Sequence, residues 1–137
     1  MSLFVDTSAL YALLVRTEDG HDRVADEFNR ALKAGRALLT SNYVLLETTA
    51  LLQHRIGLEA VRDLSAGIVP LLRTHWITED LHRLAVDRLL RGDRRRVSLV
   101  DETSFLVMES EGVRDALALD RHFEEEGFRV VPRPASV

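Results

Sequence analysis

The sequence contains no cysteine and only one lysine, Lys33. Without cysteine the chain can form no disulfide, no thiolate zinc site and no cysteine nucleophile. It also has no uncharged apolar run of about 18 residues, the length that a membrane helix requires. The first residues, Met1 to Asp6, carry no basic segment of the kind that begins a secretion signal. We therefore expect a cytoplasmic protein with no membrane partner.

An excess of positive charge is also missing. The 18 basic residues are outnumbered by 22 acidic ones, which gives a formal net charge of −4. The overall charge is therefore not that of a strongly basic nucleic-acid-binding protein. All the basic residues except Lys33 are arginine. This bias is typical of a GC-rich genome, and a second interpretation is selection for guanidinium groups that bind phosphate.

The length of the chain suits one domain. With 137 residues, 46% of them hydrophobic and 29% charged, we expect a single globular domain over residues 1–137. A chain of this length buries roughly two thirds of its unfolded surface around one core. Internal repeats, linkers and low-complexity segments are not found.

Apolar runs and helical patterns alternate along the chain. Strands are expected at 3–5, 36–40, 73–77, 116–119 and 128–131. Helices are expected at 9–15, 21–34, 42–55, 58–68, 79–91, 99–111 and 122–126. This alternation predicts βαβ units with right-handed crossovers, hence an α/β fold with a mainly parallel sheet. In such sheets the functional site lies at the carboxyl ends of the strands.

Four acidic residues are expected at that edge of the sheet. Asp6 follows the first strand and Asp120 follows the fourth. Asp101 lies in the first turn of the helix that begins after Ser98, and Glu47 lies one turn into the helix after the second strand. The three aspartates also have a structural interpretation: Asp6 and Asp120 as helix N-caps, and Asp101 as the partner of Ser98 in a capping box.

Glu47 has no comparable structural explanation. Its helical neighbours at i−4, i−3, i+3 and i+4 are Tyr43, Val44, Ala50 and Leu51. A carboxylate on such an apolar face is costly unless something compensates its charge. We therefore favour a functional role for this residue.

Four carboxylates at one edge repel one another unless cations are present. Hard divalent cations with oxygen ligands, chiefly Mg²⁺ or Mn²⁺, suit such a cluster, whereas zinc prefers histidine and cysteine. A site of this kind can activate water and stabilise the oxygens of an in-line displacement at phosphorus. The residues thus point to metal-dependent hydrolysis of phosphodiester bonds.

The segments around these acids resemble the PIN-domain ribonucleases, in particular the small single-domain toxins of VapC type. These segments are FVDTSAL at 4–10, VLLET at 44–48, SLVDETSF at 98–105, LDRHF at 119–123 and the following Gly127-Phe128. The resemblance runs from Phe4 to about Val131. It implies a three-layer α/β/α sandwich around a mainly parallel sheet of four to five strands. It also implies a Mg²⁺- or Mn²⁺-dependent endoribonuclease that acts on RNA, leaves 5′-phosphate and 3′-hydroxyl ends, is usually a homodimer, and is inhibited by a cognate antitoxin protein.

The resemblance also assigns roles to residues. Asp6 and Asp101 would be the main metal ligands, Asp120 would complete the metal site, and Glu47 would contribute directly or through water. The hydroxyl of Thr7 or Ser8 would orient a metal-bound water or a phosphate. One departure stands out: many relatives have threonine two residues before the last acid, where this chain has Ala118.

Arginines next to the acids are candidate contacts for RNA. The RGDRRR segment at 91–96 leads into the helix that carries Asp101, so Arg96 could contact the phosphate backbone; the alternative is a solvated loop. Arg121 and His122 follow Asp120 and could also touch phosphate. We interpret His122 mainly as a surface histidine and only secondarily as a proton donor.

Three further expectations concern packing. Adjacent helical residues point about 100° apart, so Glu102, next to Asp101, is expected to face solvent. Trp76 and Phe123 are expected in the core rather than stacked on bases. The helix at 42–55 has apolar residues on more than one face, which suits packing on a second subunit or an antitoxin helix. These residues are Tyr43, Leu45, Leu46 and Leu52.

Two phosphotransfer families share this fold class and an acidic Mg²⁺ site. Receiver domains and haloacid-dehalogenase-type phosphatases both use a lysine near the phosphoryl group, whereas Lys33 lies late in a predicted surface helix. The shortage of lysine therefore argues against both. Two hypotheses stay open beside the toxin: a PIN-like scaffold that only binds partners, and a housekeeping RNA-processing nuclease.

Overall fold

The computed structural model describes residues 1–92, 94 and 96–133. Five parallel strands in this part of the chain form one sheet, in the order β3–β2–β1–β4–β5. The strands are β1 (Ser2–Val5), β2 (Ala37–Ser41), β3 (Arg73–His75), β4 (Asp115–Leu117) and β5 (Arg129–Val131). The predicted α/β fold with a parallel sheet is confirmed. Of the four to five strands predicted, the described residues form five.

The central strand β1 forms the middle of the core. Phe4 is aligned with Leu39 of β2 on one side and with Ala116 of β4 on the other, and all three side chains are fully buried. A parallel sheet with helices on both faces needs apolar residues at successive positions, because neither face of its strands meets water. This requirement explains why β1 reads as an uninterrupted apolar run.

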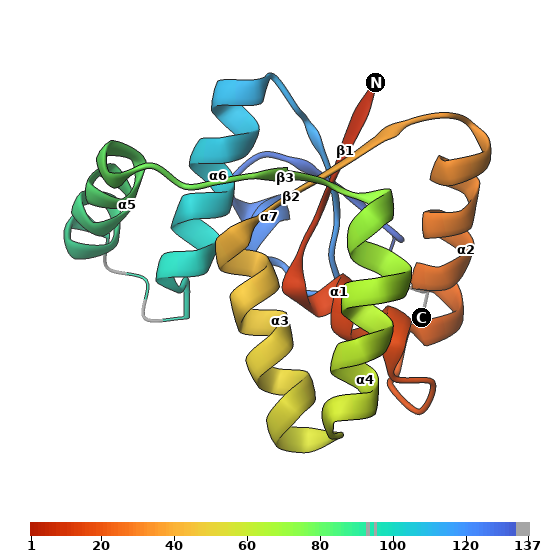
Figure 1. Cartoon of the computed structure of the whole chain (residues 1–137). Coiled ribbons are helices and arrows are strands. Elements are labelled where there is room, and N and C mark those ends of the chain that lie inside the picture. The colour runs from red at the N-terminus through yellow and green to blue at the C-terminus, as the bar shows by residue number, and fades with distance from the viewer. Residues whose placement is uncertain (93, 95, 134–137) are drawn as a thin grey trace.

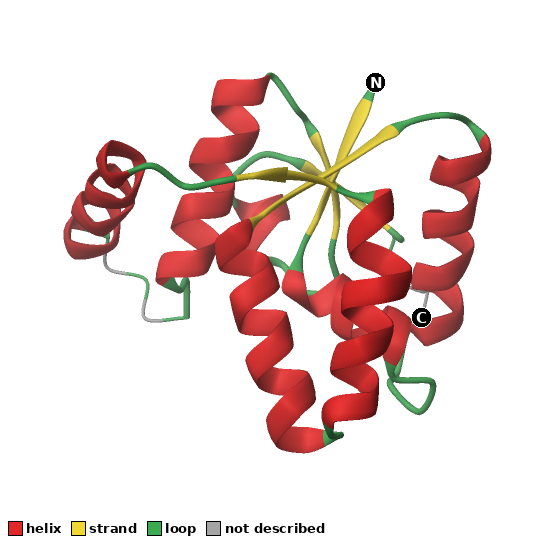
Figure 2. Cartoon of the chain, viewed as in Figure 1, coloured by secondary structure: helices red, strands yellow, loops and turns green. Residues whose placement is uncertain are grey.

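Helices lie on both sides of the sheet (Figures 1 and 2). They are α1 (Thr7–Leu14), α2 (His21–Lys33), α3 (Asn42–Arg55), α4 (Leu58–Asp63), α5 (Glu79–Arg91), α6 (Leu99–Glu111) and α7 (His122–Glu125). Figure 1 shows α2 and α6 on opposite sides of the strands. From β1 the chain adds β2 and then β3 on one side of the sheet, and it then returns to add β4 and β5 on the other side of β1. With right-handed crossovers, this reversal places helices on both faces of the sheet.

Local capping explains why several helices begin and end where the sequence predicts. The hydroxyl of Thr78 accepts a hydrogen bond from the Leu81 amide at the start of α5, and α5 spans the predicted residues. Helix α6 begins after Ser98 and ends at Gly112, whose φ of 68° is the left-handed conformation that glycine adopts without steric cost.

One helix is shorter than predicted. The segment 58–68 was expected to be a continuous helix, but α4 ends at Asp63 and is followed by a wider π-helical turn at Leu64–Ile68 and a 3-10 turn at Val69–Leu71. Pro70 cannot donate a backbone hydrogen bond, which favours irregular turns over a regular helix here.

The prediction for Trp76 is wrong, whereas that for Phe123 is confirmed. Trp76 directly follows β3, one of the two edge strands of the sheet, and is 72% exposed. Phe123 is fully buried and packs edge-on against Phe105, with ring centroids 5.1 Å apart. Within the described residues, no helix is both long and apolar enough to cross a membrane.

Candidate active site

Two of the predicted acids come from neighbouring strands. Asp6 follows β1 and Asp120 lies three residues after β4, and these strands are paired side by side. The chain changes direction across the sheet between β1 and β4, so their carboxyl ends flank the topological switch point where α/β proteins bind ligands. Asp6 is buried and Asp120 is half-buried. The strand order thus brings together two carboxylates from opposite ends of the chain.

Asp6 is held in place by Ser8. The Asp6 carboxylate caps α1, accepting hydrogen bonds from the Ser8 amide at 3.2 Å and from the Ser8 hydroxyl at 2.7 Å. The same hydroxyl accepts a hydrogen bond of 2.9 Å from the Leu119 amide, beyond the end of β4. Ser8 therefore connects the end of β1 to the segment that carries Asp120.

Asp101 forms the predicted capping box and also faces the other acids. The Ser98 amide donates to Asp101 Oδ2 at 3.0 Å, and the Asp101 amide donates to Ser98 Oγ at 3.1 Å. The same Oδ2 atom lies 2.9 Å from Nδ1 of His122. The structural interpretation of Asp101 is therefore confirmed, and it does not remove the residue from the acidic cluster.

His122 completes the cluster, to a degree that the sequence did not indicate. Asp120 Oδ1 accepts a hydrogen bond from the His122 amide at 3.1 Å, and it lies 3.9 Å from the His122 ring nitrogen Nδ1. One ligand atom from each of Asp101, Asp120 and His122 lies within 4.8 Å of the others, a spacing compatible with one metal ion. The only signal in the sequence was the position of His122 two residues after Asp120.

Burial and mutual repulsion change the acidity of two of these groups. Burial, reinforced by the charge of Asp120, raises the pKa of Asp6 to about 7, although the Ser8 hydrogen bond opposes the shift. Burial also raises the pKa of Asp120, and the charge of Asp101 adds to that effect. Within the described residues, the hydrogen-bond and ion-pair partners of the three aspartates include neither lysine nor arginine. Among these direct partners, only the His122 imidazole, 2.9 Å from Asp101, could carry a positive charge, so the cluster suits a divalent metal ion.

Glu47 is less closely associated with this cluster. It lies on α3, which begins directly after β2 with Ser41 as its N-cap, and its side chain is half-buried. The group of Asp101, Asp120 and His122 does not include it, and the described part of the chain gives it no ion pair or hydrogen bond. Its role stays a prediction.

Of the two hydroxyls next to Asp6, that of Thr7 is the available one. Ser8 donates to Asp6 and accepts from Leu119, so its hydroxyl is engaged. Thr7 Oγ1 is buried, and among the described residues it finds no hydrogen-bond partner. A buried polar atom without a partner is uncommon, and one beside a carboxylate cluster suits a water molecule or ligand.

The arginine-rich segment before α6 is divided between structural and exposed residues. Arg94 pairs at 2.8 Å with Glu126, the residue that follows α7, and that hydrogen bond raises the Arg94 pKa. Arg96 is exposed, whereas residues 93 and 95 lie outside the described residues. Arg121, the other arginine predicted to contact RNA, is exposed beside Asp120.

Glu102 does not face solvent, so that prediction is wrong. Its side chain is only 3% exposed and lies 3.3 Å from the Arg88 guanidinium and 3.6 Å from that of Arg94. Helix α5 packs across this face of α6, and Arg88 also pairs with Glu126 at 2.8 Å. These four side chains form an ion-pair network that ties α5, α6 and α7 together behind the cluster.

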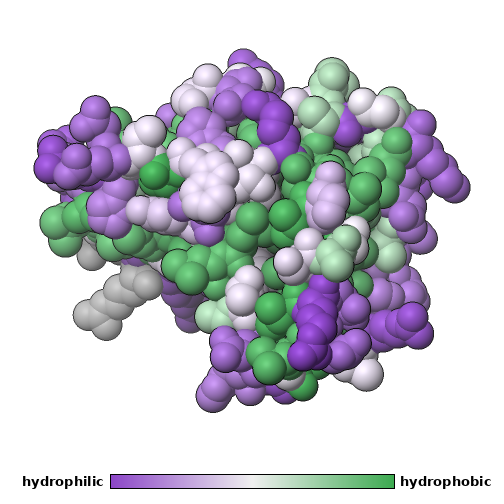
Figure 3. Space-filling model, in the orientation of Figure 1, coloured by the Kyte–Doolittle hydropathy of each residue, from purple (hydrophilic) through white to green (hydrophobic). Residues whose placement is uncertain are grey.

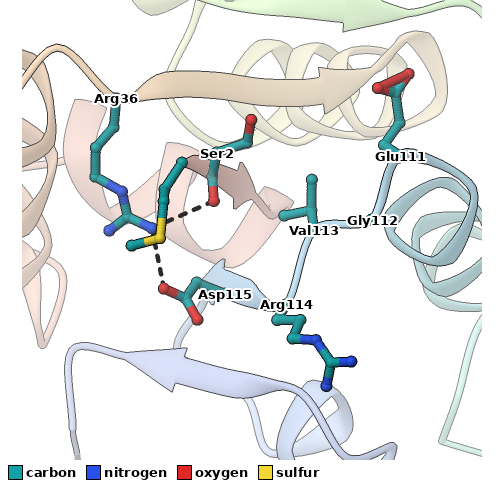
Figure 4. A pocket seen from close by; sticks show the side chains of 8 residues that line it. Ser2, Arg36, Glu111, Gly112, Val113, Arg114 and Asp115 are labelled. Carbon is teal, nitrogen blue, oxygen red and sulfur yellow. Dashed lines mark hydrogen bonds and ion pairs between the residues drawn. The ribbon is translucent and has the colours of Figure 1, made fainter.

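A separate cavity of about 310 Å³ lies at the opposite edge of the sheet (Figure 4). There the Arg36 guanidinium donates to the Ser2 carbonyl at 3.2 Å and to Asp115 Oδ2 at 3.0 Å. These residues belong to or directly precede β1, β2 and β4 at their amino ends. The cavity is therefore remote from Asp6, Asp101 and Asp120. The contacts of Arg36 with Ser2 and Asp115 connect the starts of three adjacent strands.

A parallel α/β sheet with aspartates gathered at its carboxyl edge fits several classes of metal-dependent phosphate chemistry, the PIN-domain nucleases among them. The chain matches the PIN domain family over residues 3–128. It belongs to that family, and so it is one of the PIN-domain nucleases.

Individual relatives agree with this assignment. The chain is 37% identical over 129 residues to the 23S rRNA-specific endonuclease VapC20 of Mycobacterium tuberculosis, in two strains, with 92% of this chain and 95% of that protein covered. The crystal structure of VapC20, described as a sarcin–ricin loop cleaving toxin, matches with a TM-score of 0.80 at 36% identity, covering 93% of this chain and 96% of that one. PAE2754 from Pyrobaculum aerophilum matches with a TM-score of 0.63 at 20% identity, covering 96% of this chain and 90% of that one, which shows the shared fold alone. The predicted family, fold and nuclease class are confirmed.

Proposed function

We propose that this protein is a Mg²⁺- or Mn²⁺-dependent endoribonuclease that cuts the sarcin–ricin loop of 23S ribosomal RNA. The observation that carries the proposal is the cluster of Asp101, Asp120 and His122 beside the buried Asp6. This cluster lies in a chain that shares 37% identity with a 23S rRNA-specific endonuclease over nearly its full length. The substrate is thus inferred from the relative, whereas the chemistry is inferred from the residues.

The donor set supports a hard divalent cation. Asp6, Asp101 and Asp120 would hold it, with His122 next to them, because carboxylate oxygens are the ligands that Mg²⁺ and Mn²⁺ prefer. When bound, such an ion supplies positive charge to the reacting phosphate oxygens and increases the acidity of water. The raised pKa of Asp6 supports this assignment, since it reports a buried carboxyl group beside the charges of Asp120 and Asp101.

The surrounding side chains would position the substrate and the attacking water. The unpartnered hydroxyl of Thr7 lies next to Asp6 and is available to hold water or a phosphate oxygen. Glu47, at the same edge of the sheet, is proposed to accept a proton from the attacking water. Arg96 and Arg121 are exposed and are proposed to contact the RNA backbone.

A cleavage assay tests the function directly. A sarcin–ricin loop hairpin RNA should be cut by the purified protein with added Mg²⁺ or Mn²⁺, leaving a 5′-phosphate. EDTA or the Asp6→Asn substitution, which retains a capping side chain, should abolish the cut. Asp87, one of the exposed acids on α5, provides a matched control, so Asp87→Asn should cleave normally.

Two results would contradict the proposal. Cleavage that survives EDTA or Asp6→Asn would exclude the carboxylate mechanism. Failure to cut any RNA with either metal, while the protein remains folded, would favour a binding scaffold instead.

We further propose a cytoplasmic toxin that forms a homodimer and is inhibited by an antitoxin protein. Large apolar side chains are exposed on α3, α4 and α5 and in the turn between α3 and α4, and Figure 3 shows apolar surface in the region of α3 and α4. They include Leu46, Ile56, Leu58, Leu84 and Leu90. Sedimentation of the purified protein tests the dimer. A short open reading frame upstream, whose product binds this chain and blocks cleavage, would test the antitoxin.

A further inference from the structure

A hollow of about 250 Å³ lies directly beside the acidic cluster. It is bounded by the first turn of α2, the segment after β4, the start of α7, and β5 with the proline that follows it. The residues that matter here are Arg23, Ala118, Asp120, Arg121, Val130 and Pro132. Because Asp120 belongs both to the cluster and to this lining, a molecule in the hollow would adjoin the reacting phosphate.

The floor of the hollow is apolar. Ala118 and Pro132 are buried, and Val130 is half-buried. The volume lies just below the range of about 300–1,000 Å³ that is typical of pockets for drug-sized ligands. A floor of this kind suits the face of a single base or sugar rather than a longer segment of RNA.

The rim of the hollow carries two arginines and two acids. Arg23 and Arg121 are both exposed, and within the described part of the chain neither pairs with a carboxylate. A hydrogen bond of 3.1 Å to the Arg133 carbonyl holds the Arg23 guanidinium against the segment after β5. One carboxylate besides Asp120, that of Glu124, also lines the hollow. Two guanidinium groups that are not engaged by acids are suited to bind phosphate.

We propose that this hollow binds the nucleotide next to the scissile phosphate. Its base or sugar packs on the apolar floor, and its phosphate lies between Arg23 and Arg121. This inference rests on the proposed ribonuclease function, and it adds Arg23, a residue of α2 far from the acids in sequence, to the substrate-binding residues. Ala118 helps to make the space, because a larger side chain at this position would extend into the floor.

Salt-dependent RNA binding tests the role of Arg23. Binding of a fluorescent sarcin–ricin loop hairpin is measured in EDTA, so that no cleavage occurs, at several salt concentrations. Arg23→Ala should weaken binding several-fold and reduce the slope of log K against log salt by about 0.7–0.9, the loss expected for one phosphate contact. Arg23→Glu should weaken it further, whereas Arg23→Lys should retain most of the slope.

Helix α2 offers a matched control. Arg30 lies two turns further along the same helix, is 73% exposed and pairs only with Glu27 among the described residues. Arg30→Ala should therefore bind RNA like the unmodified protein. If Arg23→Ala matches Arg30→Ala in affinity and slope, the inference is wrong. If Arg23→Ala and Arg23→Glu have equal effects together with equal losses of thermal stability, Arg23 has only a structural role, and the inference is again wrong.

A second measurement does not require RNA cleavage or tight RNA binding. Titration with adenosine, guanosine, cytidine or uridine 5′-monophosphate should shift the NMR signals of the Ala118 methyl group and of the Arg23 and Arg121 guanidinium groups. Arg23→Ala should weaken that binding. If no mononucleotide shifts these signals, the hollow is not a nucleotide site. If the Arg23→Ala variant cleaves the hairpin at the same rate as the unmodified protein, this inference alone is overturned. If the unmodified protein does not cleave the hairpin but mononucleotides still shift the NMR signals, the proposed function alone is overturned.

Discussion

Nδ1 of His122 lies 2.9 Å from Oδ2 of Asp101 and 3.9 Å from Oδ1 of Asp120. The imidazole thus sits between the first turn of α6 and the segment after β4. It lies between two carboxylates that repel each other and is within hydrogen-bond distance of that of Asp101. A histidine in this position can orient the acids, bind a metal ion itself, or do both.

The first prediction concerns this histidine. We expect His122→Ala to lower cleavage or apparent metal affinity by about 10- to 100-fold, the range typical for the loss of a group that orients metal ligands. Cleavage rates measured as a function of Mn²⁺ concentration would show the change. His54→Ala, which alters an exposed histidine near the end of α3, should have no effect. Equal activities of the two variants at every metal concentration would exclude a role for His122.

The second prediction concerns pH and Asp6. Its pKa is about 7 in the folded chain, whereas the ordinary value is 3.8, so the folded state binds this proton more tightly. The stabilising contribution of the proton is complete below about pH 4 and is lost as the pH rises through about 7. In EDTA we therefore expect Asp6→Asn to be more stable than the unmodified protein at pH 8, by on the order of a few kcal/mol, and similar to it near pH 4. Thermal unfolding across this range measures the difference, and a difference that does not depend on pH would contradict the prediction.

The third prediction concerns the ion-pair network behind the cluster. Removing Arg88 would leave Glu102, which is 3% exposed, without its nearest cation. Because Arg94 still lies 3.6 Å from Glu102, we expect Arg88→Met to reduce the free energy of unfolding by about 1.5–3 kcal/mol, the range for a hydrogen bond between charged groups. Arg83→Met, which breaks an exposed pair with Glu79 on the same helix, should cost less than about 1 kcal/mol.

A double variant separates charge from packing in this network. Adding Glu102→Gln to Arg88→Met removes the stranded charge, so chemical denaturation should show part of the stability restored. If the double variant is as unstable as the sum of the two single variants, the Arg88 side chain acts through packing alone.

The fourth prediction concerns metal binding and the two roles of Asp101. Mn²⁺ at 100 times its dissociation constant should stabilise the protein by about 2.7 kcal/mol, and Asp101→Asn should abolish most of that gain. In EDTA, Asp101→Asn should retain the capping box and unfold at about the same temperature as the unmodified protein. Asp101→Ala should be less stable by about 1 kcal/mol because it also loses the cap. Metal stabilisation that survives Asp101→Asn would remove this residue from the metal site.

Local signals in the sequence predict most of the elements. Helix α6 could be predicted from Ser98 at its start and Gly112 at its end, because capping and the left-handed glycine act within a few residues. The three aspartates could be predicted as neighbours because the carboxyl ends of parallel strands share one edge of the sheet. The shortening of α4 was missed, since a helical pattern does not show how a proline will reorganise the preceding turns.

What the sequence could not show was which surfaces neighbouring elements cover. The angle between adjacent residues on a helix predicts that Glu102 points away from Asp101, but not that α5 lies on that side with Arg88. Trp76 is a large aromatic residue of a kind that is often buried, yet it follows an edge strand and is exposed. The same reason explains why Arg94 binds Glu126 rather than remaining free for RNA. Such pairings depend on tertiary packing.

The hydrogen bond between the Leu119 amide and the Ser8 hydroxyl joins residues that are 111 positions apart. The acids on either side of this bond, Asp6 and Asp120, are therefore brought together only when β1 and β4 pair. Any local opening that separates β4 from β1 would thus dismantle the site, even if the helices stayed folded.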